Sequence, residues 1–345
     1  MKRLRVALET QYAYGPATGL GVYARRLCEA LKKRDDVDVV EIADPSFDVW
    51  RFDRRLYWDQ LRAPRLLRAA RADVVHCTGG TLPWRTPHPV VLTLHDLVWL
   101  RGANRGRPYV RWYFGDVQPR LARRADAIVA DTEAARWDIA EGLRIDPARI
   151  SVCGAGVDPS FFDLKNQRSA GALAPDPYIL SVGTVEERKD LITAVRAVAQ
   201  MPDVRLISAG HLTPYAREVM REIESLGVEA RVELKGFVDD AELLSLYAGA
   251  AAFVFPSRYE GFGLPPLQAL AAGVPVVAAR IPVLEEVLGD CALFAPPGDA
   301  SAFAGALHGA LSGPSALIER GIERARTFTW PAVAGSMVEV YRRLV

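Results

Sequence analysis

The sequence has few cysteines and no long hydrophobic run. Its 345 residues include four scattered cysteines, and none of them forms a Cys-x-x-Cys pair: Cys28, Cys77, Cys153 and Cys291. We therefore expect buried, reduced thiols instead of a disulfide framework or a zinc site. No stretch approaches the ~20 apolar residues of a membrane span. The first apolar run, Leu4–Leu8, is too short for a signal peptide, so we expect a cytoplasmic protein.

The sequence also has almost no net charge, with a formal value of +1. This value hides an asymmetry: residues 1–165 carry 27 Lys and Arg against 21 Asp and Glu, and residues 166–345 carry 16 against 21. Two interpretations stay open for the basic half. It could attract phosphate, anionic lipid or the inner face of the membrane, or it could present ordinary solvated helix faces. No nucleic-acid partner is expected.

Short apolar runs recur along both halves, with helical stretches between most of them. The sequence predicts twelve strands, at residues 4–8, 37–42, 74–77, 90–94, 127–130, 150–153, 178–182, 205–209, 232–234, 252–255, 274–278 and 292–294. Continuous apolar strands that alternate with helices are typical of parallel sheets covered on both faces. The pattern predicts an α/β fold with two doubly wound units and a ligand site in the cleft between the carboxyl ends of their strands.

A segment rich in Pro, Gly, Ala and polar residues separates the two halves. We interpret residues 165–177 as the linker, because they offer little to bury. The expected organisation is an amino-terminal domain at 1–165, which would hold the acceptor, and a carboxy-terminal domain at 166–329, which would hold the donor. A final amphipathic helix at 330–345 is expected to pack back on the first domain.

The strongest local motif is the run PSRYEGFGLPPLQ at residues 256–268, which follows a strand and opens a helix. Pro265 or Pro266 suits the first helical turn, where no amide donor is needed. The amides near Gly261 and Gly263 could approach an anion at the helix amino terminus. Glu260 precedes this position, where a carboxylate suits sugar hydroxyls better than phosphate. The alternative is an ordinary loop acid beside a tight glycine turn.

A second motif, GTVEERKD at residues 183–190, places Arg188 and Lys189 at a strand-to-helix junction. Arginine can bind phosphate with its planar fork, and lysine binds it as a point charge. Two cations at a helix start oppose the helix dipole, which favours a bound anion there. The alternative is a pair of exposed, solvated cations.

Together these runs resemble a known family. The sequence resembles the retaining glycosyltransferases of the GT-B superfamily, family 4 (group 1), which includes bacterial mannosyltransferases. The resemblance covers nearly the whole chain and rests on GLGVYARRL (19–27), LHDL (94–97), GTVEERKDL (183–191), KGFVDDAEL (235–243) and PSRYEGFGLPPLQALAAGVPVV (256–277).

The resemblance implies roles for individual residues. Arg188 and Lys189 would hold the donor diphosphate after Gly183, and Glu260, the first acid of an E-x7-E motif, would contact the transferred sugar. His95 would face that sugar from the other domain. The remaining donor-binding residues would be Gly19 and Gly21 in a loop that closes over the donor, Val238 beside the base, and Phe262, Gly263 and Leu264 near the sugar and phosphates.

Two positions depart from the family pattern. The second acid of E-x7-E is Gln268 here, so the ribose contact would lose its charge but keep its hydrogen bonds. Thr184 stands where many members carry an arginine, and Arg188 would supply that charge.

Other candidates are weaker. Asp36-Val37-Asp38 is the one possible metal motif, and we assign it no metal; His211 could line the nucleotide pocket.

The resemblance implies a hexosyltransferase (EC 2.4) that needs neither a cofactor nor a metal. Its partners would be a nucleotide-diphosphate sugar, with GDP-mannose or a GDP-deoxyhexose as the expected donor, and a saccharide or lipid-linked acceptor of surface polysaccharide synthesis. The aromatic and basic segments 50–71 and 99–124 could meet the membrane. Two other functions remain open: a nucleotide-sugar epimerase of the same fold, and a catalytically silent nucleotide-binding subunit.

Overall fold

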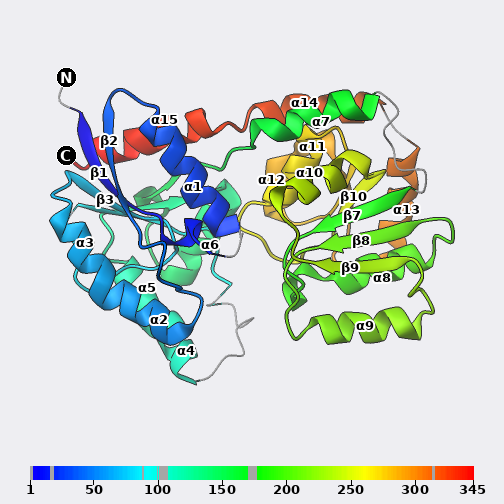
Figure 1. The fold of residues 1–345 in the computed structure, drawn as a ribbon, viewed down its shortest axis with the longest axis horizontal. Helices are drawn as coiled ribbons and strands as arrows, with labels where there is room; N and C mark the ends of the chain where they lie inside the picture. Colours follow the sequence, from blue (N-terminus) through cyan, green and yellow to red (C-terminus); the bar gives the residue numbers. More distant parts are fainter. Residues whose placement is uncertain are drawn as a thin grey trace. The chain divides into compact units, whose positions relative to one another are not determined.

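The computed structural model describes residues 3–15, 19–87, 89–98, 100, 108–169, 177–312 and 315–345, and for 166–169 the backbone alone. The chain divides into two compact units, each built around its own parallel sheet (Figure 1). Unit 1 comprises Met1–Gly156 with Thr329–Val345, and unit 2 comprises Val157–Phe328.

The sheet of unit 1 has six parallel strands in the order β2-β1-β3-β4-β5-β6. Their bounds are β1 Leu4–Glu9, β2 Val37–Ile42, β3 Val74–Cys77, β4 Val90–Thr93, β5 Ala127–Ala130 and β6 Ile150–Val152. The central strands β3 and β4 are buried along their whole length, as expected for apolar strands covered on both faces. Strand β2 lies on one side of β1 and β3 lies on the other, so the strand order reverses between β1 and β3.

Helices cover the sheet of unit 1. Their bounds are α1 Gly19–Lys32, α2 Phe52–Tyr57, α3 Ala63–Ala69, α4 Pro108–Trp112, α5 Gln118–Ala122, α6 Glu133–Leu143 and α15 Trp330–Arg342. A π-helical turn, Trp58–Arg62, joins α2 to α3, and another, Tyr113–Val117, joins α4 to α5. The apolar face of α15 packs against α1, which places the end of the chain in unit 1.

The sheet of unit 2 repeats this plan in the order β12-β11-β10-β7-β8-β9, again all parallel. Its strands are β7 Tyr178–Val182, β8 Arg205–Ala209, β9 Val232–Gly236, β10 Ala252–Phe255, β11 Val276–Ala279 and β12 Leu293–Ala295. Its helices are α7 Pro159–Ser169, α8 Leu191–Ala199, α9 Ala216–Ser225, α10 Asp240–Gly249, α11 Leu264–Ala271, α12 Pro282–Leu288, α13 Ala300–Leu311 and α14 Ser315–Arg326. The strand order reverses between β7 and β10.

The predicted α/β fold is confirmed, and the twelve predicted strands lie within two residues of the observed ones. The predicted linker is wrong in part. Residues 165–169 belong to α7, which packs against α10 and α11, so the first boundary falls at Gly156 and not at residue 165. The remaining linker residues, 170–176, lie outside the described residues. The return to unit 1 falls at Thr329.

Two further differences concern helices. The sequence analysis did not predict α14, which packs against α11 so closely that a Cβ on Gly321 would lie 2.9 Å from a methyl carbon of Leu270. It also placed Gly19 and Gly21 in a loop, whereas both belong to the first turn of α1. In the described part of the chain, no helix combines the length and apolar character needed to cross a membrane.

Candidate active site

The candidate site of unit 2 lies at the carboxyl ends of β7 and β10. In open parallel sheets, ligands bind where the strand order reverses, because the loops that leave the two neighbouring strands diverge there. In unit 2 these loops are 183–190, after β7, and 256–263, after β10. The two strongest motifs of the sequence therefore meet at one edge of the sheet.

Glycine at position 183 fits the start of the first loop. Gly183 has a φ of +148°, in the region that favours glycine, and a Cβ there would lie 3.7 Å from Cε of Lys189. Gly183, Thr184 and Lys189 line one narrow pocket with a volume of about 10 Å³, about the space that one water molecule fills. The loop ends at Asp190, whose backbone is left-handed where α8 begins.

The second loop ends in the amino terminus of α11. Gly263 precedes this helix with a φ of +93°, and a Cβ there would lie 2.5 Å from a methyl carbon of Leu284. Pro265 follows in the first turn, which needs no amide donor at that position. Because Pro265 and Pro266 carry no N–H and the Leu267 amide donates to the carbonyl of Gly263, the first turn of α11 leaves the Leu264 amide for a ligand.

Glu260 is the centre of the charge cluster. Its carboxylate is 8% exposed, and one oxygen accepts from the Lys189 ammonium at 2.5 Å, while the other lies 3.2 Å from Nη1 of Arg188. The Ser257 hydroxyl donates a short hydrogen bond to the same carboxylate. The sequence analysis named Arg188, Lys189 and Glu260, and the structure brings these three side chains together.

The cluster shifts the pKa values of its members. Burial alone would raise the pKa of Glu260, but the charges of Lys189 and Arg188 outweigh burial and lower it. Burial lowers the pKa of the Lys189 ammonium, although Glu260 opposes that effect. Glu260 is therefore an anion at neutral pH, held between two fixed cations.

Arg188 also joins the two loops. Its Nη1 donates to the carbonyl of Tyr259 at 2.9 Å, and its Nη2 lies 2.7 Å from Glu186. A second bridge runs in parallel, because Nε of Arg258 donates to the buried Asp190 carboxylate at 2.8 Å. These bonds hold the two loops in one geometry, which a site that binds a transition state requires.

The remaining donor-binding candidates of unit 2 lie along the same edge. Phe262 and Gln268 are buried, and the side-chain amide oxygen of Gln268 accepts from the hydroxyl of Tyr247 at 3.4 Å. Val238 follows β9, next to the half-exposed ring of Phe237, which stacks on His211 with centroids 4.8 Å apart. The stacked rings of His211 and Phe237 therefore follow β8 and β9, which lie two and three strands from β10.

His95 follows β4 in unit 1, where Gly19 and Gly21 also lie. Its Nδ1 is 2.6 Å from the buried carboxylate of Asp131, and its Nε2 is 3.2 Å from the backbone carbonyl of Thr78. Burial alone would lower the pKa of His95, but Asp131 and, to a smaller extent, Asp96 and the Thr78 carbonyl raise it. His95 is one of the residues predicted from the sequence, and its partner Asp131 is not.

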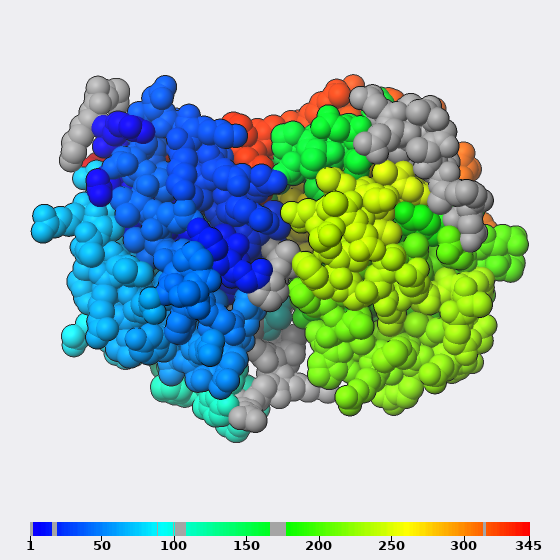
Figure 2. All heavy atoms as spheres, viewed as in Figure 1, coloured from blue at the N-terminus to red at the C-terminus, as the bar shows by residue number. Residues whose placement is uncertain are grey.

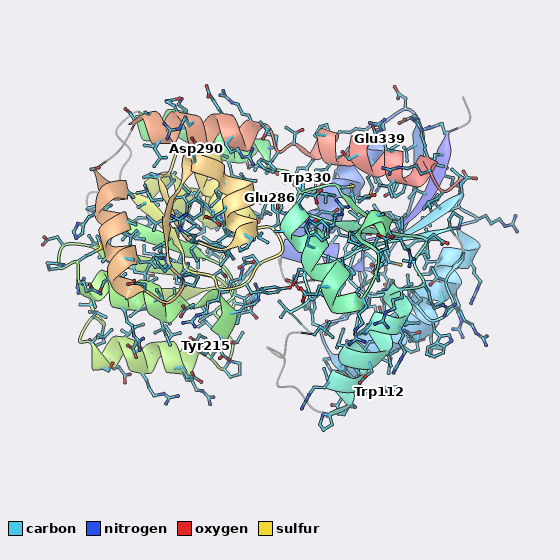
Figure 3. All side chains as sticks on the ribbon, turned by 180° about the vertical axis from the view of Figure 1, so that it is seen from behind. Trp112, Tyr215, Glu286, Asp290, Trp330 and Glu339 are labelled. Atoms are coloured by element: carbon cyan, nitrogen blue, oxygen red, sulfur yellow. The ribbon has the colours of Figure 1, made fainter. Side chains whose placement is uncertain are left out.

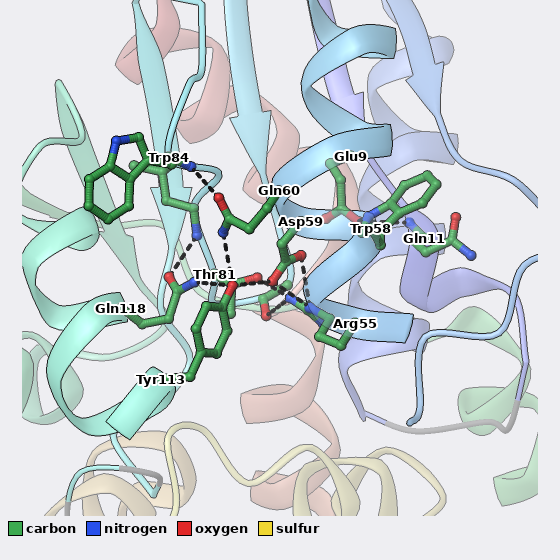
Figure 4. Close-up of polar contacts among 12 residues, drawn as sticks. Glu9, Gln11, Arg55, Trp58, Asp59, Gln60, Thr81, Trp84, Tyr113 and Gln118 are labelled. Carbon is green, nitrogen blue, oxygen red and sulfur yellow. Dashed lines mark hydrogen bonds and ion pairs between the residues drawn. The ribbon is translucent and has the colours of Figure 1, made fainter. Parts of the chain in front are cut away.

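A second polar cluster, in unit 1, escaped the sequence analysis (Figure 4). Arg55 bonds Asp59 at 2.8 Å and also the hydroxyl of Thr81, and Tyr113 donates to Asp59 at 3.1 Å. Glu9, at the end of β1, accepts from the indole of Trp58 at 3.1 Å, and burial raises the pKa of its carboxyl group. An acid directly after an apolar strand and an i,i+4 Arg–Asp pair were the available signals.

The described residues contain no group of three or more His, Cys, Asp or Glu side chains arranged around a metal position. Asp36 pairs with Arg34 and Arg342, and Asp38 pairs with Arg5. The carboxylates of the possible metal motif therefore serve as ion-pair partners on the surface of unit 1.

Two family models match nearly the whole chain. The model described as "Glycosyltransferase Family 4" matches residues 17–161, and the model described as "Glycosyl transferases group 1" matches residues 163–328. The boundary between the two matches lies close to the boundary between the two units.

Relatives of this chain include bacterial mannosyltransferases. It is 30% identical over 318 residues to the MMP alpha-(1->4)-mannosyltransferase of Mycolicibacterium hassiacum, and the aligned region covers 83% of this chain and 74% of that protein. It is 35% identical over 181 residues to the O-antigen chain mannosyltransferase B of Escherichia coli, which spans 50% of this chain and 47% of that protein. The chain thus spans about half the length of the second relative.

Solved structures share the fold. The sucrose-phosphate synthase of Thermosynechococcus elongatus superposes with a TM-score of 0.78 at 23% identity, covering 99% of both chains. HepE of Anabaena in complex with UDP and glucose superposes with a TM-score of 0.74 at 18% identity, covering 99% of this chain and 100% of that one. The fold and these matches define a glycosyltransferase of the GT-B fold. The chain belongs to glycosyltransferase family 4, group 1, and it is mannosyltransferase-like.

Proposed function

We propose that this glycosyltransferase is a retaining, metal-independent hexosyltransferase. It moves mannose or a related deoxyhexose from a nucleotide-diphosphate sugar, GDP-mannose in particular, to a saccharide or lipid-linked acceptor of surface polysaccharide synthesis. The observation that carries the proposal is the cluster of Arg188, Lys189 and Glu260 at the point where the strand order of unit 2 reverses. The names of the mannosyltransferase relatives support the choice of sugar.

Lys189 is the group that stabilises the leaving diphosphate. Negative charge grows on the bridging oxygen as the bond to the sugar breaks, so a fixed cation aimed there stabilises the transition state more than the ground state. Lys189 lines the pocket with Gly183 and Thr184, and its ammonium is held in place by Glu260. The amino terminus of α11, through its helix dipole and the Leu264 amide, adds a second source of positive potential.

Glu260 orients the transferred sugar through the hydroxyl groups of that sugar. Its carboxylate is bound by Lys189, Arg188 and Ser257, so it is a weak nucleophile and a fixed hydrogen-bond acceptor. A front-face route, in which the acceptor hydroxyl attacks on the side from which the diphosphate departs, needs no protein nucleophile and retains the configuration of the sugar.

A thermal-shift panel of GDP, UDP, ADP and dTDP tests the donor site. A ligand that binds only the folded state raises the melting temperature. We expect a shift with GDP, its loss in Lys189→Ala, and no loss in Lys235→Ala, where the lysine pairs with exposed acids in the same unit. A shift with UDP and none with GDP would overturn the choice of donor. No shift with any of the four would count against the catalytic proposal.

Product analysis separates this proposal from the two other functions. With GDP-mannose and a mannose-containing acceptor, we expect GDP release, a glycosidic product of retained anomeric configuration and unchanged rates in EDTA. Conversion of the donor sugar without an acceptor would identify an epimerase. Nucleotide binding without sugar release would identify a silent subunit, which Gln268 in place of the usual acid makes conceivable.

The proposed place of action is the cytoplasmic face of the membrane. Helices α2 and α4 of unit 1 present an exposed surface formed by Leu56, Tyr57, Tyr109 and Trp112, which we term the aromatic surface. The ring of Phe52 on α2 lies 5.1 Å from that of Tyr109 on α4, and an open hollow of about 550 Å³ adjoins both helices. Trp112, on α4, is 60% exposed, and Figure 3 labels its position on unit 1.

Three exposed arginines lie on or beside the same two helices: Arg51, Arg54 and Arg111. Arg51 pairs with Asp53 at 3.2 Å, and Arg54 lies 3.8 Å from Asp48. In Figure 2 the helices α1 to α3 form much of the visible face of unit 1. Aromatic rings between arginines suit the interface of an anionic bilayer, where rings enter the headgroup layer and guanidinium groups bind phosphates.

Flotation with liposomes tests the membrane contact. We expect binding to vesicles with anionic lipid at low salt, weaker binding at high salt because surface charges are screened, and loss in a Tyr109→Ser/Trp112→Ser double variant. Trp137→Ser, which removes an exposed tryptophan from α6, is the matched control. Protein that stays wholly at the bottom at low salt would contradict the contact.

A further inference from the structure

Two histidines at the carboxyl edge of the unit 1 sheet differ in the chemistry of their partners. His76, in β3, lies 2.7 Å from the hydroxyl of Tyr341 and 2.7 Å from that of Thr93. A hydroxyl can donate or accept, so these partners suit a neutral ring with one N–H. Burial lowers the pKa of His76 to about 3, so its ring is neutral at physiological pH.

The partners of His95 are acceptors alone. Its Nδ1 faces the carboxylate of Asp131 at 2.6 Å, and its Nε2 faces the carbonyl of Thr78 at 3.2 Å. Neither partner can donate a hydrogen bond, so both contacts are satisfied only when both ring nitrogens carry a proton. The geometry therefore suits the imidazolium form.

The surroundings of His95 hold this arrangement. The Thr78 hydroxyl donates to the carbonyl of Glu9 at 2.6 Å, which fixes the loop after β3. The ring of Tyr23, from α1, contacts the His95 ring edge-on with centroids 4.6 Å apart. The charged and titratable groups that face His95 are Asp131 from the β5 loop, Asp96 from its own loop, Tyr23 and the neutral His76.

Asp131 is well suited to act on His95 alone. Its side chain is 3% exposed, and its second oxygen, Oδ1, is buried without a hydrogen-bond partner among the described residues. A buried carboxylate whose described side-chain partner is one imidazole favours the charged form of that imidazole strongly. His95 itself keeps 16% of its side chain exposed, so its ring can still reach a ligand.

We propose that Asp131 is a positioning residue that holds His95 as an imidazolium, so that His95 serves the transfer reaction as a fixed cation and hydrogen-bond donor and not as a general base. A general base needs a free lone pair, and Nε2 faces a carbonyl oxygen instead. The effect on turnover rests on the proposed function; the charge of His95 does not.

Nuclear magnetic resonance of the full chain, labelled with ¹⁵N at histidine, measures the charge directly. The chain has five histidines, and His95→Gln identifies the signal. We expect both His95 nitrogens to be protonated at neutral pH, and Asp131→Asn to lower the midpoint by about one to three pH units. Asp38→Asn, an exposed ion-pair acid of the same unit, is the control and leaves the midpoint unchanged. A singly protonated wild-type ring at neutral pH overturns the proposal, whether or not Asp131→Asn folds.

The pH dependence of kcat/KM tests the role in turnover. An essential imidazolium is lost as pH rises, so activity should fall as pH rises through the His95 midpoint. In Asp131→Asn this decline should begin at lower pH, and activity should recover on acidification below the new midpoint. Activity that rises with pH through the same midpoint would show a general base and overturn the proposal. If the ring is an imidazolium while no nucleotide binds and no sugar is transferred, the proposed function fails and the charge assignment stands.

Discussion

At the residue scale, Glu260 fixes two cations, and in the proposed function it also orients the sugar. Replacing it with glutamine keeps the shape but removes a charge-assisted hydrogen bond of about 1.5–3 kcal/mol. We therefore expect Glu260→Gln to lower kcat roughly 10- to 100-fold, with a smaller change in the KM for the donor. Steady-state kinetics with Glu233→Gln, an exposed acid, as the control checks this. Equal kcat values in the two variants would remove Glu260 from the chemistry.

The lowered pKa of Glu260 also links stability to pH. A carboxyl group whose pKa is lower in the folded state stabilises the fold above its unfolded pKa, and this stabilisation is lost as pH falls through the folded value. The unfolded value is near 4.5, so the loss belongs below about that pH. We expect the melting temperature of the wild type to fall more steeply on acidification from about pH 5 than that of Glu260→Gln. Parallel curves would show that Glu260 contributes no such linkage.

Sequence reasoning found the charged residues of unit 2 because they stand in adjacent positions of two specific motifs. It did not find the bridges from Arg188 to Tyr259 and from Arg258 to Asp190, since these depend on how two loops far apart in sequence approach each other. Asp131 was missed for the same reason. Nothing in its local sequence indicates that the ends of β4 and β5 bring it within 2.6 Å of His95.

At the scale of elements, close approach of loops requires glycine at one position above all. The loops after β7 and β8 touch at Gly210, which has a φ of +152° and whose Cβ would lie 2.0 Å from the carbonyl oxygen of Gly183. The carbonyl belongs to the backbone and has little room to move. Two residues further along both loops, Val185 and Leu212 form an isolated parallel β-bridge.

We expect Gly210→Ala to destabilise unit 2 by about 2–4 kcal/mol, as a clash with backbone adds to the strain of the dihedral angle. Gly227→Ala is the matched control, because Gly227 also has a positive φ, +64°, but a Cβ there meets nothing within 4 Å. That variant should lose about 1–2 kcal/mol from the backbone conformation alone. Urea denaturation of both variants measures the difference, and equal losses would mean that the β8 loop moves away at little cost.

The sequence predicted elements well where the pattern was strong and poorly where it was not. The apolar strands gave a clear signal because their side chains are buried on both faces of the sheet. Helix α14, which packs against α11, was not predicted, and α1, which packs against α15, begins earlier than predicted, at Gly19. In both cases tertiary contacts decide the result over local preference.

At the scale of the whole molecule, the chain enters unit 2 once and leaves it once, while unit 1 is built from two segments. Composition alone suggested a division at residue 165, because the following residues are polar and rich in small side chains. The structure divides the chain earlier, since the first half of α7 carries Phe161 and Leu164, which are both buried in unit 2. The ring of Phe161 contacts that of Tyr247 with centroids 5.2 Å apart.

This difference predicts how two fragments behave. A fragment of residues 157–328 contains all of α7, so we expect it to fold cooperatively and to shift its melting temperature with GDP. A fragment of residues 166–329, cut at the boundary that composition suggests, loses Phe161 and Leu164 and should be less stable by at least about 3–5 kcal/mol, the usual cost of removing a buried aromatic side chain. Urea denaturation followed by circular dichroism compares the two fragments. Equal midpoints would mean that residues 157–165 add nothing to the stability of unit 2, and the boundary at residue 165 would then stand.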